Sequence, residues 1–541
     1  MKAKLTKLIL SVFIMSVNGL FAQVDQFNYS SAPLKPTGSP LFGKDIVIHD
    51  LPDRDQRNIA VCSAFNGWLY AAYSYSTPNM PFIVFLRSID NGITWNVFWD
   101  GPAGPGPIIT KIDITTTGNS LSNLKVFIAE LGYDPVSGTS DGEIGRYNSD
   151  WEGEELLLDE SYWVKDIALA SDMCFPAGNS NPNSIAILYS IHHNRDSIIF
   201  KSSTDGGITF NNYLHLAWTN RYFDKVSLSY GYSSTMNTGR YFATWEQKDN
   251  YDSIAGHIYT AHTEPDINSP FTTPVCIDSL DPSTINKVTN ALIACQVNNL
   301  DNDSSNLTEV ILYDRYYPSS NSYVLKGLYN MRATSSTNFK PFSITPSSGS
   351  IQQPDIIFNP FASTFMFTYF DSTSLKLPIL THNFNMTAPD SWQTFNAGYN
   401  DSSNISSPKP NIEMNWIEQD EMNSWIADGV DGNGIALFDA SYSTYTPISE
   451  TKQGWLSLIC VYPNPCSDYT YIEFQNKRPE FISLSIFNLM GVEIVNIPRH
   501  FYGVGIQKVY INCKDLKDGC YYFSIKSPED DLKGKIVVSK L

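Results

Sequence analysis

The sequence predicts an all-β protein, a β-propeller followed by a small Ig-like β-sandwich, on three observations. Short strand-forming runs alternate with turn signals from about residue 40 to 445, and no helical period accompanies them. Aromatic residues make up 13% of the chain and charged residues 17%, which suits an extracellular all-β protein. Similar strand units recur about 53 to 66 residues apart, the length of a four-stranded blade with loop insertions.

Residues 1–22 are typical of a secretory signal peptide. Three lysines precede the apolar run from Leu8 to Met15, and a cleavage site is expected after Ala22. The apolar run is too short for a membrane span, and no later stretch reaches that length without charged or polar breaks. We therefore expect a mature protein without a transmembrane segment.

Residues 23–445 are expected to form the propeller. The strand units begin near Asn58, Lys111, Val164, Lys225, Val288, Pro354 and Pro410, which favours seven blades. The last unit is one strand short, and the segment from Lys44 to Ile48 is expected to supply the missing strand and close the ring. Six blades plus a separate β-element is the alternative.

Two segments share the pattern S-x-D-x-G-x-T-aromatic: Ser88 to Trp95 and Ser203 to Phe210. In a hairpin turn the Asp carboxylate accepts backbone N–H groups, the Ser hydroxyl adds a local bond, and Gly adopts a positive φ. The pattern resembles the Asp-box, or BNR repeat, of sialidase-like β-propellers. In that family these boxes lie on hairpins away from the ligand face, so the resemblance implies a scaffold and not a catalytic site.

The charge of the chain is unevenly distributed. The net charge is −19, and residues 24–459 carry 23 basic and 46 acidic residues. So acidic a body argues against nucleic acid or an anionic membrane as its partner.

After a linker at residues 446–459, residues 460–541 carry a series of landmarks in a fixed order. These are Tyr462-Pro463-Asn464-Pro465, a strand ending in N-x-x-G at Asn488, G-x-Y-x-F from Gly519, and a last strand from Lys535 to Lys540. The alternating strands and the Pro-rich entry predict a small antiparallel sandwich.

The landmarks of residues 460–541 resemble the type A C-terminal sorting domain of the type IX secretion system of Bacteroidota. The resemblance implies that this domain engages the type IX secretion machinery. The protein would then pass through the periplasm and be secreted or displayed on the outer-membrane surface. An adhesive Ig-like module that stays attached is the alternative.

Eight cysteines are present, without a C-x-x-C motif or spacings that suggest a zinc site. An even number behind an export signal permits disulfides. Cys513 and Cys520, on either side of a turn at Asp518-Gly519, are the first pair to test. Reduced, buried cysteines remain the alternative.

Sialidase chemistry requires an arginine cluster for a carboxylate, a Tyr nucleophile with a Glu, and an Asp acid/base. Sialidases commonly carry an Arg-Ile-Pro or Arg-Leu-Pro segment on the opening strand, where this chain reads Pro52 to Asn58. The arginines with a chance of reaching a central channel are Arg57, Arg221, Arg240 and Arg315, the last followed by Tyr316 and Tyr317. With 31 tyrosines in the chain, Arg-Tyr neighbours are expected by chance.

Other polar motifs favour structural interpretations. His192-His193, His257 and His262 lack metal-ligand spacing on a shared face. The segment from Asp428 to Gly434 resembles a calcium loop but lacks its closing Glu, so we interpret it as a hairpin turn. We interpret residues 298–303 as a polar loop. The sequence therefore assigns no catalytic, cofactor-binding or metal-binding residue.

The sequence favours a secreted or cell-surface propeller that binds a glycan or an extracellular protein without catalysis. An exo-acting glycoside hydrolase of sialidase type is the alternative, and an adhesin or other structural surface component is a third hypothesis.

Overall fold

The structure is a computed structural model in which two compact units are separated after Ser443. It describes residues 45–49, 51, 53–78, 80–103, 107–149, 155–160, 163–172, 183–192, 196–217, 222–233, 238–248, 256–264, 271–277, 287–297, 307–317, 322–334, 337–342, 344, 351–360, 364–371, 379–382, 393–395, 407–415, 420–428, 433–440, 456–477, 480–488, 493–503, 505–527 and 531–540. The predicted signal peptide lies outside these residues. Within them, no helix has the length and apolar character of a membrane span.

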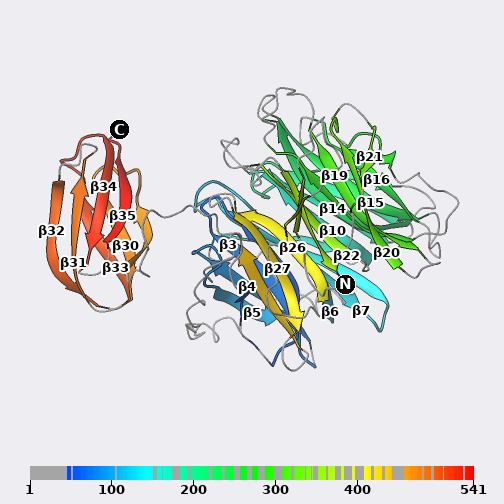
Figure 1. Cartoon of the computed structure of the whole chain (residues 1–541), viewed down its shortest axis with the longest axis horizontal. Helices are drawn as coiled ribbons and strands as arrows, with labels where there is room; N and C mark the ends of the chain where they lie inside the picture. Colours follow the sequence, from blue (N-terminus) through cyan, green and yellow to red (C-terminus); the bar gives the residue numbers. More distant parts are fainter. Residues whose placement is uncertain are drawn as a thin grey trace, which may run out of the picture. The chain divides into compact units, whose positions relative to one another are not determined.

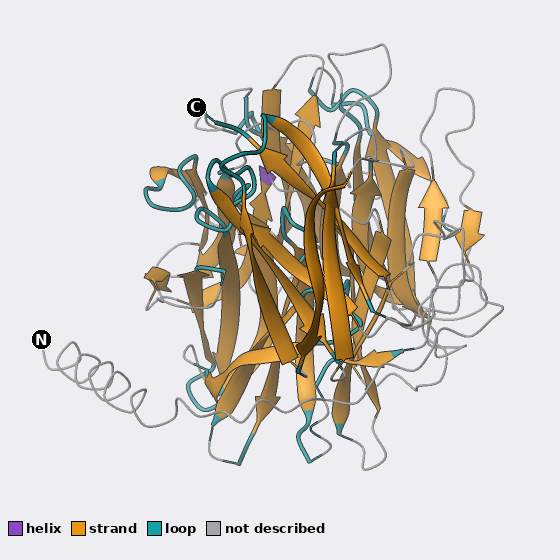
Figure 2. Cartoon of the chain, turned by 90° about the vertical axis from the view of Figure 1, so that its left-hand side faces the viewer, coloured by secondary structure: helices purple, strands orange, loops and turns teal. Residues whose placement is uncertain are grey.

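In the first unit, the described strands form seven four-stranded antiparallel sheets (Figures 1 and 2). Each sheet contacts the next through its innermost strand, and the last contacts the first, so the sheets are the blades of a closed propeller. The inner strands are β2 (Gln56–Ser63), β6 (Ile108–Thr117), β10 (Trp163–Ser171), β14 (Tyr222–Ser233), β18 (Lys287–Cys295), β22 (Ile351–Asn359) and β26 (Ser407–Asn415). Each predicted unit start falls in one of these strands, which confirms the predicted fold.

From the channel outward, each blade continues with three more strands. The second strands are β3 (Leu69–Ser76), β7 (Lys125–Asp134), β11 (Ile185–His192), β15 (Thr238–Lys248), β19 (Glu309–Tyr317), β23 (Thr364–Asp371) and β27 (Asp420–Asp428). The third are β4 (Pro81–Ser88), β8 (Thr139–Tyr147), β12 (Asp196–Ser203), β16 (Gly256–His262), β20 (Ser322–Asn330), β24 (Ile379–His382) and β28 (Gly434–Ala440). The outermost are β5 (Asn96–Pro102), β9 (Glu155–Glu160), β13 (Asn211–Ala217), β17 (Val275–Cys276), β21 (Lys340–Phe342), β25 (Gln393–Phe395) and β1 (Ile46–Val47).

The ring is closed by the first strand, as the sequence predicts. Strand β1 pairs with β28, with Ile46 opposite Phe438. Next to this pair, the buried Gln56 side chain donates to the His49 carbonyl oxygen at 2.9 Å and accepts the Ala436 N–H at 2.7 Å. A Cβ at Gly434 would lie 2.1 Å from the Gln56 carbonyl oxygen, so this close approach requires glycine. The first and last blades are therefore joined through both backbone and side chains.

Each blade is also joined to the next by a hydrogen bond between one of its side chains and the backbone of the next blade's inner strand. In six of the seven junctions this side chain accepts an N–H, and in the first Asn58 donates to a carbonyl. The bonds are Asn58 to Ile109 O, Asp113 to Leu169 N, Asp166 to Val226 N, Ser227 to Ile293 N, Asp314 to Gln353 N, Asp355 to Ile412 N and Asn411 to Val61 N, at 2.7–3.2 Å. These bonds satisfy backbone groups that would otherwise be buried without a partner.

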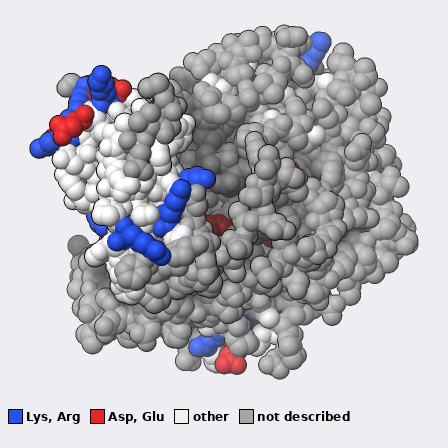
Figure 3. Space-filling model, turned by 60° about the vertical axis from the view of Figure 1, so that its left-hand side comes forward, with Lys and Arg blue, Asp and Glu red and all other residues white. Residues whose placement is uncertain are grey.

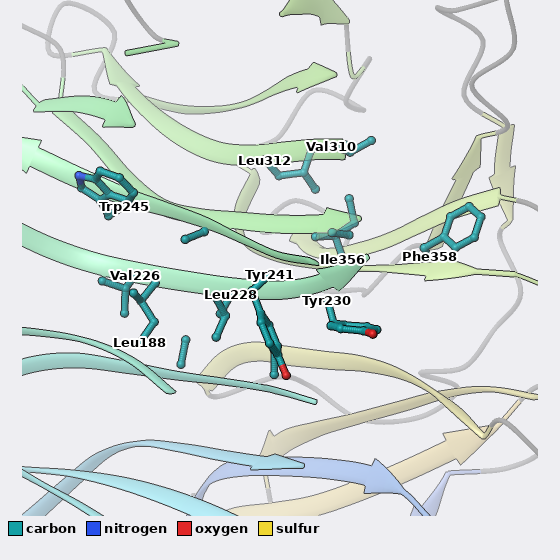
Figure 4. Packing of buried hydrophobic residues seen from close by; sticks show 14 of the residues in the cluster. Leu188, Val226, Leu228, Tyr230, Tyr241, Trp245, Val310, Leu312, Ile356 and Phe358 are labelled. Carbon is teal, nitrogen blue, oxygen red and sulfur yellow. The ribbon is translucent and has the colours of Figure 1, made fainter. Parts of the chain in front are cut away.

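The hydrophobic core lies between the blades. Figure 4 shows Leu188 of β11, Val226 of β14 and Leu312 of β19 among the buried side chains that pack together. Trp245 and Trp425 are among the largest fully buried side chains. The core therefore consists of interfaces between sheets, as expected for radially packed blades.

The two S-x-D-x-G-x-T turns have the predicted local bonds. Between β12 and β13, Asp205 Oδ1 accepts the N–H of Ile208 and of Thr209 at 2.9 Å, and the Gly207 N–H donates to Ser203 Oγ at 2.9 Å. Gly206 and Gly207 have φ of 73° and 75°. Partial burial acts to raise the pKa of Asp205, but the bonds from Thr209, Ser203 and Ile208 outweigh it and lower the pKa to about 2.

The equivalent turn between β4 and β5 has the same pattern. Asp90 accepts the Thr94 N–H at 2.8 Å, and the Gly92 N–H donates to Ser88 Oγ at 2.8 Å. Trp95 is buried and packs edge-on against Phe438 with ring centroids 5.4 Å apart. The turn therefore holds its aromatic residue over the neighbouring hairpin.

The second unit is a β-sandwich, which confirms the predicted fold of this region. One sheet has β29 (Leu456–Tyr462), β30 (Tyr469–Asn476) and β33 (Gly505–Asn512); the other has β31 (Glu480–Phe487), β32 (Glu493–Tyr502), β34 (Gly519–Lys526) and β35 (Asp531–Val538). Buried Ile472, Phe474, Ile486 and Phe523 belong to the core between them. Basic and acidic side chains both appear on the face of the described surface drawn in Figure 3.

Candidate binding site

Every inner strand of the propeller contains a β-bulge near its N-terminal end. The register with the second strand shifts between Arg57 and Ala60 in β2, and at the equivalent place in β6, β10, β14, β18, β22 and β26. A bulge turns the extra residue out of the ladder and redirects its side chain. Seven such bulges surround the same end of the central channel, which we call the bulge end.

Three of the bulge residues have a left-handed backbone. Asn58, Asn290 and Gln353 have φ of 55°, 57° and 53°. This conformation is uncommon for residues other than glycine, and strained positions of this kind concentrate at functional sites. All three residues line the channel. These residues therefore make the bulge end the candidate functional end of the propeller.

The channel at this level is a cavity of about 330 Å3 to which each blade contributes a polar residue. One such residue per blade, in blade order, is Asn58, Lys111, Asp166, Lys225, Asn290, Gln353 and Asn411. These amide, ammonium and carboxylate groups supply both donors and acceptors of hydrogen bonds. A second cavity, of about 160 Å3, continues the channel past Cys62, Ser171 and Tyr230.

Charges of opposite sign alternate across blades 2, 3 and 4. Lys111 Nζ lies 3.0 Å from Asp166 Oδ1, and Asp166 is 2% exposed. Burial acts to raise the pKa of Asp166, but Lys111, Lys225 and the Val226 N–H outweigh it and lower the pKa. Asp166 in turn raises the pKa of Lys225. Asp166 is therefore an ionised group held between two cations.

Three carboxylates face the channel more deeply: Asp113 of β6, Asp355 of β22 and Glu413 of β26. Burial raises the pKa of Asp113, raises that of Asp355 to about 7 and raises that of Glu413 to about 8. The charges of Asp113 and Asp355 raise the pKa of Glu413 further. Within the described residues, no group of three or more His, Cys, Asp or Glu side chains is arranged to hold a metal ion.

An aromatic group lies at the bulge end of blades 3 and 4. Trp163, at the start of β10, lies opposite His192 in the ladder, with ring centroids 4.9 Å apart. The ring of His192 stacks on Tyr222 of β14 at 6.4 Å. Trp163 is 37% exposed. Trp163, His192 and Tyr222 are called the aromatic group below.

A buried acid holds the aromatic group in position. Asp196 is 3% exposed and accepts hydrogen bonds from Lys165 Nζ at 2.8 Å and from the Phe223 N–H at 3.1 Å. His192 Nδ1 also bonds Asp196. The Lys165 ammonium lies 5.7 Å from the centroid of the Tyr222 ring. The aromatic rings are therefore fixed by a charged network beneath them.

The structure separates the candidate arginines. Arg57 is at the bulge end of β2 and pairs with Asp55, with a side chain 56% exposed. Arg240 lies near the opposite end of the propeller, where its guanidinium is 3.5 Å from Glu264. Arg315 is in the second strand of blade 5, opposite Val288 and Val324. Arg221 lies outside the described residues.

The histidine and loop candidates have separate positions. His192 belongs to the aromatic group, whereas His257 and His262 are in β16. Burial and the charge of Arg240 lower the pKa of His262 to about 4. His193, residues 429–432 and residues 298–303 lie outside the described residues.

The sequence identified His192 only as a metal candidate, did not single out Trp163, and assigned no binding role to the bulge residues. One signal was available: an Asn, Asp or Lys stands at each unit start or within two residues after it. Those residues now prove to be the polar lining of the channel and the links between blades.

Comparison with solved structures finds similar folds at low identity. A protein of unknown function from Dyadobacter fermentans is 11% identical, with 73% of this chain and 97% of that chain covered and a TM-score of 0.41. An α-L-arabinofuranosidase of Fusarium graminearum in complex with arabinobiose is 11% identical, with 74% and 97% covered and a TM-score of 0.41. A variant of the NanB sialidase of Streptococcus pneumoniae is 10% identical, with 62% and 68% covered and a TM-score of 0.37. No curated protein matches the chain.

The fold defines the class of the protein: a seven-bladed β-propeller followed by a C-terminal β-sandwich. The sandwich is more specific, because the family model for the secretion system C-terminal sorting domain matches residues 460–539. The chain therefore carries a type IX sorting domain and is exported to the cell surface or secreted.

Proposed function

We propose that the exported protein is a carbohydrate-binding propeller that holds a glycan at the bulge end of its channel. The observation that carries this proposal is the exposed Trp163 ring beside His192, which stacks on Tyr222, at the same end of the propeller as a channel with a polar residue from every blade. Exposed aromatic rings supply a flat apolar surface, and the surrounding polar groups supply directional hydrogen bonds. A sugar ring offers one apolar face and a rim of hydroxyl groups, so it matches both.

The strained bulge residues support the same end of the propeller. Asn58 and Asn290 present amide groups, and amides both donate and accept hydrogen bonds, as sugar hydroxyls do. Lys111 and Lys225 favour a ligand that also carries an acidic group, although Asp166 between them offsets part of their charge. We therefore expect neutral or weakly acidic glycans to bind more tightly than basic ones.

The test is glycan-array screening of the full mature chain, followed by calorimetry with the strongest hit. Trp163→Ala should weaken binding at least tenfold, a loss of about 1.4 kcal/mol. Trp99→Ala is the matched control, because Trp99 is similarly exposed at 36% but lies on the outermost strand of blade 1. Binding that survives Trp163→Ala, or a ligand that proves to be a protein, contradicts the proposal.

A second candidate is an exo-acting glycoside hydrolase, favoured by the raised pKa values of Asp355 and Glu413. A carboxyl group that stays protonated near pH 7 can act as a general acid toward a glycosidic oxygen. Arg57 and Arg240 lie toward opposite ends of the propeller, which argues against the arginine cluster that a sialidase requires.

The two candidates separate in an assay with a panel of 4-methylumbelliferyl glycosides. The binding proposal expects no turnover by the wild-type protein. Turnover that Glu413→Gln abolishes while glycan affinity persists would establish the hydrolase. Asp53→Asn, at an exposed position, is the control for loss of a negative charge.

A further inference from the structure

Two buried cysteines of the sorting domain lie side by side. Cys466 is in the connection between β29 and β30, and Cys513 directly follows β33. Their Sγ atoms are 3.3 Å apart, and the residues are 2% and 0% exposed. Cys513 thus faces Cys466, whereas the sequence pointed first to its pairing with Cys520. The side chain of Cys520 lies outside those that the structure describes.

The backbone on both sides of this contact is held by hydrogen bonds. The Cys466 N–H donates to the Val537 carbonyl at 2.9 Å, and the Ser539 N–H donates to the Cys466 carbonyl at 2.8 Å. The Cys513 N–H donates to the Asp468 carbonyl at 2.8 Å. The folded domain therefore brings the two thiols together without help from a covalent bond.

The other described cysteine of this domain is engaged elsewhere. Cys460 Sγ contacts Glu473 Oε2 at 3.6 Å, on strands β29 and β30. Burial, with the nearby Glu473 charge, raises the pKa of Cys460 to about 11. Cys466 and Cys513 are thus the pair that the fold itself selects.

We propose that Cys466 and Cys513 form a disulfide in the exported protein. Two S–H bonds break and one S–S bond forms, while the disulfide of a periplasmic thiol oxidoreductase takes up the two electrons and the two protons and becomes a dithiol. The export route supplies this setting, because the periplasm is oxidising. Burial also raises the pKa of the Cys513 thiol to about 12, so oxidation belongs to folding, before the pair is buried.

The disulfide would stabilise the end of the sorting domain. Cys466, in the connection between β29 and β30, forms a parallel bridge with Val538 of the last strand, β35, and Cys513 continues from β33, which pairs with β30. A bond between them would fix the connection that holds β35 to the end of β33. The C-terminal strand would then resist detachment while the protein is exported.

The test is disulfide mapping on the full chain exported to the periplasm of a Gram-negative host. Free thiols are blocked with N-ethylmaleimide, and the unreduced protein is digested for mass spectrometry. The expected result is a cross-linked peptide pair containing Cys466 and Cys513. Alkylated thiols at both positions, or Cys513 joined to Cys520 or Cys460, would overturn the proposal.

A second measurement follows thermal unfolding with and without dithiothreitol. Reduction should lower the unfolding temperature of the wild-type sorting domain on the order of 10 °C, since the bond closes a long loop. The Cys466→Ala/Cys513→Ala variant should show no such shift, and Cys62→Ala, in the propeller, should keep it. Should the double variant not fold, mapping on the wild-type chain still decides. A wild-type transition that dithiothreitol leaves unchanged contradicts the proposal.

Discussion

The two ends of blade 3 hold carboxylates with hydrogen-bond partners of different kinds. At the hairpin end, the bonds described for Asp205 all join residues within four positions along the chain. At the bulge end of the same sheet, Asp196 accepts bonds from Lys165 and Phe223, which are 31 and 27 residues away. The hairpin end is therefore organised by neighbours in sequence alone, whereas Asp196 at the bulge end bonds distant residues as well as His192, four positions away. Mutations at the two ends should therefore differ in cost.

The largest difference should appear between Asp166→Ala and Asp205→Ala. Asp166 is buried and bonds Lys111 and the Val226 N–H from two other blades. Its loss leaves these groups without their partner and should lower the free energy of unfolding by about 3–5 kcal/mol. Asp205→Ala breaks bonds in an exposed turn and should cost about 1 kcal/mol. Urea unfolding of both variants measures the difference in the free energy of unfolding. Equal losses of stability would contradict the proposed difference between the two ends.

The second prediction concerns the pH dependence of the bulge end. Glu413 has a pKa of about 8 in the folded protein, above its ordinary value of 4.5. The folded state therefore binds this proton more tightly, so the stability contribution is fully present below pH 4.5 and is lost as the pH rises through 8. The melting temperature should fall between pH 5 and pH 8.5, and Glu413→Gln should remove several degrees of that fall.

Charge repulsion in the acidic body acts in the same direction, so a control is needed. Asp53→Asn removes one exposed negative charge and should leave the slope of melting temperature against pH nearly unchanged. An equal slope in wild type and Glu413→Gln would show that the channel carboxylate does not contribute.

The smallest predicted effect is the release of backbone strain. Gln353 has φ of 53°, and its buried Oε1 has no hydrogen-bond partner among the described residues. Gln353→Gly should therefore stabilise the propeller by up to about 1 kcal/mol, because glycine adopts this conformation without a Cβ penalty. Gln352→Gly, one residue earlier in the same strand, should destabilise it. If Gln353→Gly also weakens glycan binding, the strained backbone at this position serves ligand binding.

Local patterns in the sequence predicted much of the fold. The seven unit starts, the turns at Asp90 and Asp205 and the closing strand near Ile46 were all predicted, because each depends on residues close together in the chain. The landmarks of residues 460–539 likewise identified the sorting domain. The sequence predicted that a central channel exists but not which residues line it, because no local motif indicates which residues of seven separate strands will face one another.

The sequence by itself therefore determined the repeat, the blade boundaries and the export route, because strand alternation, turn chemistry and a sorting signal are encoded over short spans. Only the tertiary structure decided that His192 contacts both Trp163 and Tyr222, that Asp166 lies between Lys111 and Lys225, and that Cys513 faces Cys466. Sheet packing places these pairs of residues together across 29 to 59 positions of the chain, a separation over which sequence periodicity carries no information about contacts.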